Sequence, residues 1–592
     1  MSVKQLTVAS LLISIPGHAQ KPPAHFEITV EKNVPATMRD GTILRADVYR
    51  PRDAGRFPAL LQRTPYSKNS SRAAQEFSAL ASRGFVVVIQ DTRGRYMSDG
   101  EARPHDEAED GFDTIAAVAK LPYVNGKVGM FGGSYLATTQ LLAATLKPPA
   151  LVALFPASSY ASRYDMVFQG GAFYLSDGLG WNLGQAVDVR RRILTPQADR
   201  DGPTGLNRDE SKAFREQWLW HTPLKSIDAL EIRKYAPGYF LMLDHPTYDA
   251  YWKTFDIAAK HDQFQVPAHH LTGWYDTLLT GTLRNFTGLR AHAGSEQARR
   301  YQRLIVGPWT HARPTLESTK IGDVDFGPTA GLDSQELMAR WFAFWLRDGD
   351  RAAVEGAAVR IFVMGENRWR DEQEWPLARA RSTAYYLGSD GHANTASGDG
   401  GLSLLAKSRA SADRFVYDPS DPAPTGERGG YSRTPSDQRE TEKRADVLVY
   451  STRPLAENVE VTGPVSVTLW VASSARDTDF TAKLVDVFPD GTARALSDGI
   501  LRARYRNGQS KPELLKPDEP VEITIDAGAT SNLFKTGHRI RLDISSSNFP
   551  RFDRNPNTGG AFGEESKLLR AEQTVLHDAN HPSRLTLPVV PR

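Results

Sequence analysis

The sequence predicts an α/β fold: a doubly wound, mostly parallel sheet with an inserted helical cap, followed by a C-terminal β-domain. Strand-like and helix-like runs alternate over residues 27–160 and again over 258–350. Between them, residues 161–257 have few strand signals and many aromatic residues, which indicates a helical cap. From residue 351 to 592, short alternating segments are separated by Gly-, Pro- and Asp-rich turns. Strands alternating with helices are typical of a parallel sheet, whereas short strands joined by turns are typical of an antiparallel sandwich.

The elements of the α/β region are expected from two patterns. Short runs rich in Val, Ile and Leu are typical of strands buried on both faces of a parallel sheet. Longer runs with apolar residues at every third or fourth position are typical of helices. The expected strands are residues 44–49, 59–62, 85–89, 128–131, 268–272 and 304–306. The expected helices are residues 73–83, 110–120, 136–146 and 334–347.

The cap and the C-terminal region give different signals. The cap contains charged, helix-like stretches such as residues 208–220. In the C-terminal region, residues 359–364, 465–471 and 521–525 read as short strands of the sandwich. Residues 389–413, rich in Gly, Ser and Ala, read as an extended loop within it.

The composition limits the classes of protein to consider. The chain has 592 residues, which is too long for a single hydrophobic core. This length suggests about three or four structural units. It carries 72 basic and 70 acidic residues, a net charge of +2, without a basic tract, so no nucleic-acid partner is expected. The sequence contains no cysteine, which excludes disulfides, cysteine–zinc sites and a thiol nucleophile.

The N-terminus has the pattern of a short secretory signal. One lysine precedes an apolar run over residues 6–15, and the small residues Gly17 and Ala19 follow. We expect cleavage after Ala19, so that residues 1–19 are a signal peptide and the mature protein is secreted or periplasmic. The run is too short to span a bilayer, and no other segment of the sequence is long and apolar enough.

One serine stands in the pattern of a tight strand-to-helix turn. Residues 131–137 read Phe-Gly-Gly-Ser-Tyr-Leu-Ala, between the expected strand 128–131 and the expected helix 136–146. Small residues allow the strained backbone that would expose Ser134 Oγ at the carboxyl edge of the sheet. Position 136 is leucine where the usual motif has glycine, and a glycine turn before a helix is common. The partners of the serine therefore decide its role.

Two later strand ends supply the partners that an acyl-transfer serine needs, a histidine base and an acid that orients it. The first strand ends in Gly-Trp-Tyr and Asp276, and the second is broken by Gly-Pro and followed by Trp-Thr and His311. Both polar residues lie at carboxyl ends of strands, where open α/β sheets bind ligands. We expect Ser134, Asp276 and His311 to form one site. His269 and His270 lie inside a strand, so at least one is expected to be buried and structural.

Hydrogen-bond donors are also needed for the negative charge that develops on the carbonyl oxygen. One expected donor is the backbone N–H of Tyr135. The second should come from the loop after the strand 59–62, which reads Thr-Pro-Tyr-Ser-Lys. The Tyr66 hydroxyl is the candidate, and the alternative is a tyrosine that packs on the Pro65 turn.

These segments together resemble the cocaine esterase and X-Pro dipeptidyl-peptidase group of α/β-hydrolases, which includes α-amino-acid ester hydrolases and β-lactam acylases. The resemblance covers nearly the whole chain after the N-terminal run. It implies Ser134 as nucleophile, Asp276 and His311 as its relay, Tyr66 and Tyr135 as the oxyanion hole, and a jelly roll at the C-terminus. No metal or organic cofactor is implied. The matching segments are residues 38–41, 49–51, 64–68, 90–95, 126–135, 273–276, 307–311 and 534–541.

The resemblance also has consequences for the substrate pocket. In α-amino-acid ester hydrolases, two acids that bind the substrate ammonium follow the triad aspartate by two and three residues. Leu278 and Leu279 stand at those positions here, and the corresponding cap position falls near Phe168. Pairing an ammonium with leucine would carry a large desolvation cost. The resemblance implies instead an apolar, substrate-binding pocket formed by Phe168, Trp181 and Leu278.

The expected function is hydrolysis of esters, or activated amides, of small carboxylic acids through an acyl-enzyme on Ser134. The alternative on the same scaffold is an X-Pro dipeptidyl-peptidase, or an acylase acting on β-lactams or amino-acid esters. The alternative from another class is a non-catalytic carbohydrate-binding protein. The expected partner is a small-molecule ester or amide substrate, with no nucleic acid and no membrane span, and a homo-oligomer is compatible with the sequence.

Overall fold

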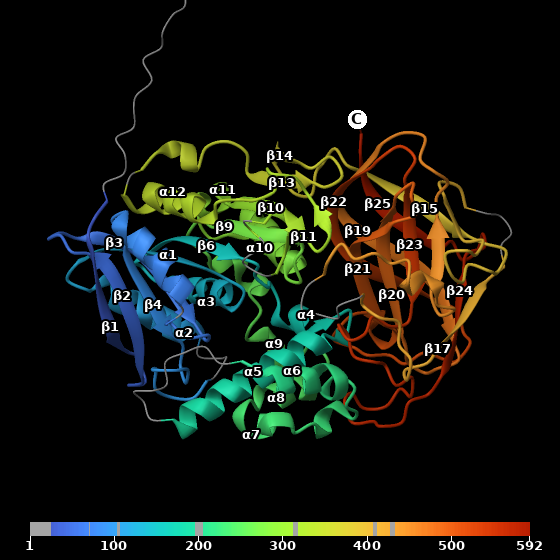
Figure 1. Ribbon diagram of the computed structural model, residues 1–592, viewed down its shortest axis with the longest axis horizontal. Coiled ribbons are helices and arrows are strands. Elements are labelled where there is room, and N and C mark those ends of the chain that lie inside the picture. Colours follow the sequence, from blue (N-terminus) through green and yellow to red (C-terminus); the bar gives the residue numbers. More distant parts are fainter. Residues whose placement is uncertain are drawn as a thin grey trace, which may run out of the picture.

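The computed structural model describes residues 25–69, 71–102, 107–195, 205–311, 316, 318–347, 349–406, 411–426 and 433–591. The expected signal peptide lies outside the described residues. Figure 1 shows an α/β region on the left, a group of helices below it, and a β-sheet domain on the right that contains the C-terminus.

The α/β region is built on one ten-stranded sheet. Its strands are β1 (Ile28–Thr37), β2 (Ile43–Pro51), β3 (Phe57–Thr64), β4 (Val86–Asp91), β5 (Val124–Gly133), β6 (Leu151–Ala157), β9 (His269–Tyr275), β10 (Arg303–Thr310), β13 (Val359–Val363) and β14 (Arg368–Glu372). The spatial order is β1-β2-β4-β3-β5-β6-β9-β10-β13-β14. The strands from β4 to β13 in this order run parallel, while β1, β2 and β14 are antiparallel additions at the two edges.

Helices cover both faces of this sheet, which confirms the expected α/β architecture. They are α1 (Ser71–Ser82), α2 (Glu107–Ala119), α3 (Tyr135–Ala144), α10 (Leu279–His292), α11 (Glu296–Arg300) and α12 (Ser334–Arg347). Neighbouring strand residues point to opposite faces. Met130 packs in the core that contains Leu141 of α3, whereas Phe131 packs in the core that contains Phe342 of α12. No helix in the described part of the chain combines the length and the apolar character needed to cross a bilayer.

The strand expected at residues 359–364 belongs to this sheet and not to the C-terminal sandwich, so that assignment was wrong. β13 pairs in parallel with β10, Leu304 opposite Val359, and β14 then pairs antiparallel with β13. β14 is the edge strand, and β13 is its neighbour within the sheet. The exposed Arg360 interrupts an otherwise buried strand, which gives the sequence the alternation typical of a half-covered antiparallel strand.

The cap between β6 and β9 is mainly helical. Its elements are α4 (Arg163–Val167), β7 (Phe168–Gln169), β8 (Ala172–Phe173), α5 (Leu175–Leu194), α6 (Arg208–Ala213), α7 (Ile232–Tyr235), α8 (Gly238–Asp244) and α9 (Ala250–Lys253). Phe173, Leu183, Tyr239 and Trp252 are buried together in the core of the cap, which Phe549 of the C-terminal domain also enters. The small β7–β8 hairpin was not expected from the sequence.

The C-terminal domain is built from eleven hydrogen-bonded strands. They are β15 (Arg381–Gly388), β16 (Gly401–Ser403), β17 (Asp413–Tyr417), β18 (Leu448–Ser451), β19 (Val459–Ser473), β20 (Asp479–Val487), β21 (Ala493–Arg502), β22 (Val521–Phe534), β23 (Arg539–Ser545), β24 (Ala571–Leu576) and β25 (Arg584–Val590). The long strand β19 pairs with β22, β24 and β25 and so joins much of the domain. Part of the expected loop 389–413 forms β16. A separate two-stranded hairpin, β11 (Lys320–Ile321) and β12 (Val324–Asp325), precedes α12.

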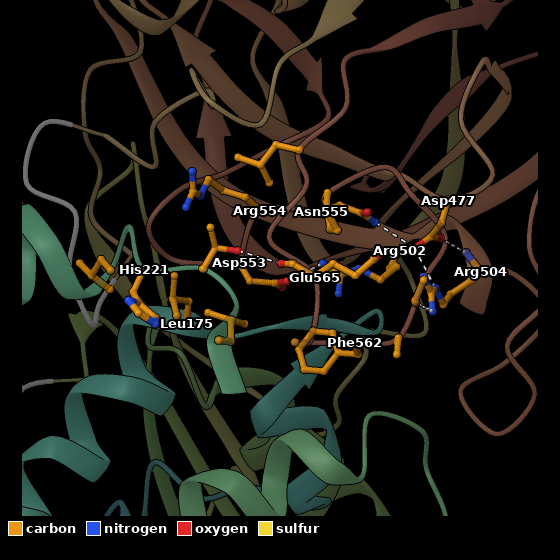
Figure 2. Close-up of a pocket in the computed structure, with 18 residues that line it drawn as sticks. Leu175, His221, Asp477, Arg502, Arg504, Asp553, Arg554, Asn555, Phe562 and Glu565 are labelled. Atoms are coloured by element: carbon orange, nitrogen blue, oxygen red, sulfur yellow. Dashed lines mark hydrogen bonds and ion pairs between the residues drawn. The ribbon is translucent and has the colours of Figure 1, made fainter. Parts of the chain in front are cut away.

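A buried ionic cluster of the C-terminal domain lies against the cap (Figure 2). Arg502 donates two hydrogen bonds of 2.9 Å to Asp479 and two of 2.9 and 3.0 Å to Asp553. Nearby, Arg504 pairs with Asp477 at 2.8 Å, and the Asn555 amide donates to Asp477 and Asp479. The carboxylates and guanidinium groups in this cluster thus satisfy one another away from water.

The same cluster holds the β7–β8 hairpin of the cap. The Phe173 N–H donates to Asp553 Oδ1 at 2.8 Å, and the Asp553 N–H donates to the Phe173 carbonyl at 2.9 Å. The Arg502 N–H donates to the Gly170 carbonyl at 2.9 Å. Because α5 begins two residues after Phe173, the C-terminal domain sets where that helix starts.

Arg502→Ala should lower the midpoint of thermal unfolding clearly. It leaves Asp479 and Asp553 buried without their cation, and breaking a buried ion pair from one side costs ~3–5 kcal/mol. For a large domain each kcal/mol corresponds to ~2–4 °C. The control is Arg570→Ala, which removes an arginine that is 76% exposed from its pair with Asp418 and should leave the midpoint unchanged. Equal midpoints for the two variants would contradict a stabilising role for the cluster.

Candidate active site

Ser134 lies at the sharp turn between β5 and α3. Its backbone has φ 60° and ψ −125°, a conformation that L-residues rarely adopt, and its N–H donates to the Ala157 carbonyl of β6 at 2.9 Å. Gly132, at φ 132°, precedes it; a Cβ there would stand 2.6 Å from Leu136 Cβ. The turn therefore requires glycine at 132 and presents Ser134 Oγ at the carboxyl end of the sheet.

The structure brings His311 and Asp276 to this serine. His311 Nε2 lies 2.9 Å from Ser134 Oγ, and His311 Nδ1 lies 2.9 Å from Asp276 Oδ1. The acid follows β9 and the histidine follows β10, which are adjacent parallel strands. Near their ends the two strands approach closely: a Cβ on Gly273 would stand only 2.1 Å from the Trp309 carbonyl oxygen, so only glycine fits there. The three side chains thus form one hydrogen-bonded row.

Asp276 is buried and fully hydrogen-bonded. Oδ1 also accepts the Leu278 N–H at 2.7 Å, and Oδ2 accepts the Ser158 hydroxyl. Burial by itself would raise the pKa of Asp276, but the charge of His311 and these hydrogen bonds outweigh it and lower the pKa. Sequence reasoning missed Ser158, although its place directly after β6 was a usable signal.

Two carboxylates act on the histidine. Burial by itself would lower the pKa of His311, but the charge and hydrogen bond of Asp276, together with the charge of Asp177, raise the pKa to about 9. Asp177 lies in the first turn of α5, and sequence reasoning did not identify it. Burial raises the pKa of Asp177 to about 6, against the opposing charges of His311 and Arg551.

The two expected donors, Tyr66 and Tyr135, lie with Ser134 in the wall of one cavity. The indole Nε1 of Trp181 donates to the Tyr66 hydroxyl oxygen at 3.1 Å, which leaves the Tyr66 proton available for another acceptor. Burial raises the pKa of Tyr66 and keeps the phenol protonated. Tyr135 begins α3, where backbone N–H groups have no partner within the helix. Its side chain is held aside by a hydrogen bond to Glu107 at 2.6 Å.

A cavity of about 260 Å³ opens beside the serine and extends under the cap. Ser134, His311 and Tyr66 lie in its wall, together with the predicted pocket residues Trp181 and Leu278. Its surface is mainly apolar, with contributions from Leu142, Met166, Val167 and Met242.

Phe168 does not line this cavity, so its assignment to the pocket was wrong. Its side chain is 0% exposed and packs in the aromatic core of the cap against Tyr164, Phe173 and Trp252. Phe168 begins the β7–β8 hairpin, and the preceding residue Val167 lines the cavity instead.

A second cavity of about 210 Å³ lies next to the same serine. Tyr66, Ser134 and His311 belong to the walls of both cavities. The second one is bounded by Gln62 and by apolar side chains from the sheet, from α3 and α12 and from the segment before α12, which are Phe131, Leu136, Phe155, Leu271, Leu316 and Met338. Both cavities therefore border the same nucleophile. Among the described residues, no group of three or more His, Asp or Glu side chains is placed to hold a metal ion.

Comparison with known families covers both parts of the chain. Residues 40–313 match the X-Pro dipeptidyl-peptidase (S15) family, and residues 354–586 match the X-Pro dipeptidyl-peptidase C-terminal non-catalytic domain. Over 590 residues the chain is 39% identical to a cocaine esterase of Rhodococcus sp. (strain MB1 Bresler), covering 95% of this chain and 99% of the relative.

Solved structures show the same architecture. An α-amino acid ester hydrolase superposes with a TM-score of 0.81 at 26% identity, covering 97% of this chain and 99% of the other. An aminopeptidase from a marine sediment archaeon, Thaumarchaeota archaeon, superposes with a TM-score of 0.80 at 24% identity, covering 98% and 99%. The resemblance expected from the sequence is thereby confirmed. The chain belongs to the X-Pro dipeptidyl-peptidase (S15) family of serine hydrolases, together with cocaine esterase.

Proposed function

We propose that the protein hydrolyses esters, or activated amides, of small carboxylic acids through an acyl-enzyme on Ser134. The observation that carries the proposal is the hydrogen-bonded row of Ser134, His311 and Asp276 at the point where two cavities meet. One cavity takes the acyl half of an ester and the other its alcohol half, with the carbonyl carbon held at Ser134 Oγ.

In the first half of the reaction, neutral His311 accepts the Ser134 proton on Nε2 while Oγ attacks the carbonyl carbon. The negative charge that forms on the carbonyl oxygen is stabilised by the Tyr66 hydroxyl and the Tyr135 N–H. His311 then gives its proton to the alcohol oxygen as the carbon–oxygen bond breaks. Asp276 holds Nδ1 protonated and stabilises the imidazolium. Water repeats the attack on the acyl-enzyme and releases the acid.

A peptidase or acylase on the same scaffold is the second candidate, because the matching family is described as X-Pro dipeptidyl-peptidase. Turnover of aryl esters, X-Pro anilides and β-lactams by one preparation separates these activities. A carbohydrate-binding protein without catalysis would turn over none of them.

A fluorophosphonate probe should label the protein once, on Ser134. Ser134→Ala should remove both the label and the turnover of para-nitrophenyl esters, because loss of such a nucleophile costs ~10⁶-fold in rate. The control is Ser162→Ala, a buried serine at the start of the cap that does not line either cavity. A label elsewhere, or more than about a hundredth of the activity in Ser134→Ala, would identify another nucleophile.

Tyr66→Phe should lower kcat by ~10²–10³ with little change in KM, because its hydrogen bond strengthens only as charge develops on the oxygen. Steady-state kinetics with a neutral aryl ester measure both constants. Tyr123→Phe, which removes a hydroxyl bonded to Glu31 outside the cavities, is the matched control and should leave kcat unchanged. If kcat falls by less than about fivefold in Tyr66→Phe, the second donor is a backbone N–H of residues 64–68 and not the Tyr66 hydroxyl.

The activity should rise with pH through the titration of His311. Below its pKa the imidazolium cannot accept the Ser134 proton, and above it the neutral imidazole can. With the pKa raised to about 9, the acid limb of kcat/KM should lie well above pH 6.5, the usual value for histidine. Asp177→Asn removes one charge that raises this pKa, so its acid limb should move to lower pH. A wild-type limb near pH 6.5, or no movement in the variant, would contradict this account.

A further inference from the structure

One carboxylate in the larger cavity has no partner of its own. Asp177 lies one helical turn before Trp181 on α5, so both side chains face the cavity that Ser134 and His311 share. Within the described residues, no side chain or backbone N–H donates a hydrogen bond to Asp177. The charges that act on it are those of His311, Arg551 and Asp276, from a distance.

Two charged groups near Asp177, Glu107 and Arg551, are already paired. Glu107, the other carboxylate of the cavity wall, accepts hydrogen bonds from Tyr135 at 2.6 Å and from Arg63 at 2.7 Å. Arg551 donates to both oxygens of Asp498 at 2.6 and 2.5 Å. Neither group therefore binds Asp177, and the cavity keeps one carboxylate that a ligand can reach.

A carboxylate in this position is costly unless a ligand pairs with it, because apolar surroundings disfavour an unpaired charge. A single carboxylate with no second oxygen ligand beside it is a poor site for a metal ion. An organic cation fits better: the ammonium would meet Asp177, the faces of Trp181 and Tyr66 attract positive charge, and Met166 and Leu278 cover the attached carbon groups.

We propose that Asp177 is a specificity-determining residue that binds a protonated amine of the substrate. The amine belongs to whichever half of the ester, acyl or alcohol, enters the larger cavity. This inference rests on the proposed function, because it concerns the substrate of the same serine. It replaces the expectation from Leu278 and Leu279 that the pocket has no anchor for an amine: the anchor comes from the cap helix.

Two pairs of esters, each matched in shape and differing in charge, test this proposal at neutral pH. The acyl pair is the para-nitrophenyl esters of phenylalanine and of phenylpropanoic acid. The alcohol pair is dimethylaminoethyl benzoate and isopentyl benzoate. The measured quantity is the ratio of kcat/KM for the amine to kcat/KM for its neutral partner. In the wild type, one of the two pairs should show a ratio of about ten or more.

Asp177→Asn should bring that ratio close to one, and Asp177→Ala should do the same. Using the ratio cancels the change in His311 basicity that both variants also cause. The matched control is Asp165→Asn on α4, whose carboxylate pairs with Arg284 outside the cavity and whose loss should leave the ratio unchanged. Thermal unfolding verifies that each variant is folded.

The outcomes distinguish a failure of this inference from a failure of the proposed ester hydrolysis on which it rests. A preference in either pair that disappears in both Asp177 variants supports the inference and identifies the half that enters the larger cavity. Ratios near one in both pairs, or a preference that survives in the variants, overturn it, while turnover of the neutral esters leaves the proposed function standing. No turnover of any ester, with no fluorophosphonate label on Ser134, would overturn both.

Discussion

The strained backbone of Ser134, with its positive φ, is the constraint on which the active site depends. It points Oγ away from the sheet and toward the ends of β9 and β10, and it leaves the N–H of Tyr135 free at the start of α3. The conformation is held by the bond from the Ser134 N–H to Ala157 and by the absence of a side chain at Gly132. The later strands then have to approach closely enough for their polar ends to reach this oxygen.

Much of this arrangement could be predicted from the sequence, because the ends of parallel strands meet at one edge of a sheet. Ser134, Asp276 and His311 each follow a strand-like run, so chain order and strand ends were enough to group them. The errors arose where position depends on packing between distant segments. Phe168 was placed in the pocket, yet the hairpin directs it into the cap core. Asp177 carries no local signal, and only the docking of α5 brings it near His311.

The carboxylates near His311 have two opposite effects on its work as a base. Asp276 holds the tautomer that a base needs and, together with Asp177, makes the protonated form more stable. A histidine that binds its proton more firmly is a stronger base once deprotonated, but fewer molecules are deprotonated at neutral pH. A cationic group held beside Asp177 would offset its charge and so release the histidine from part of this effect. Substrate binding and the readiness of the base are therefore linked through one carboxylate.

The bonds between Asp553 and Phe173 join residues that are 380 positions apart in the chain. They fix the hairpin that precedes α5, and α5 supplies Trp181 and Asp177 to the wall of the larger cavity beside Ser134. Although the matched C-terminal family is described as non-catalytic, this domain here holds the hairpin next to a helix that lines the cavity at Ser134. Chimeras that exchange this domain between relatives should consequently inherit altered selectivity as well as altered stability.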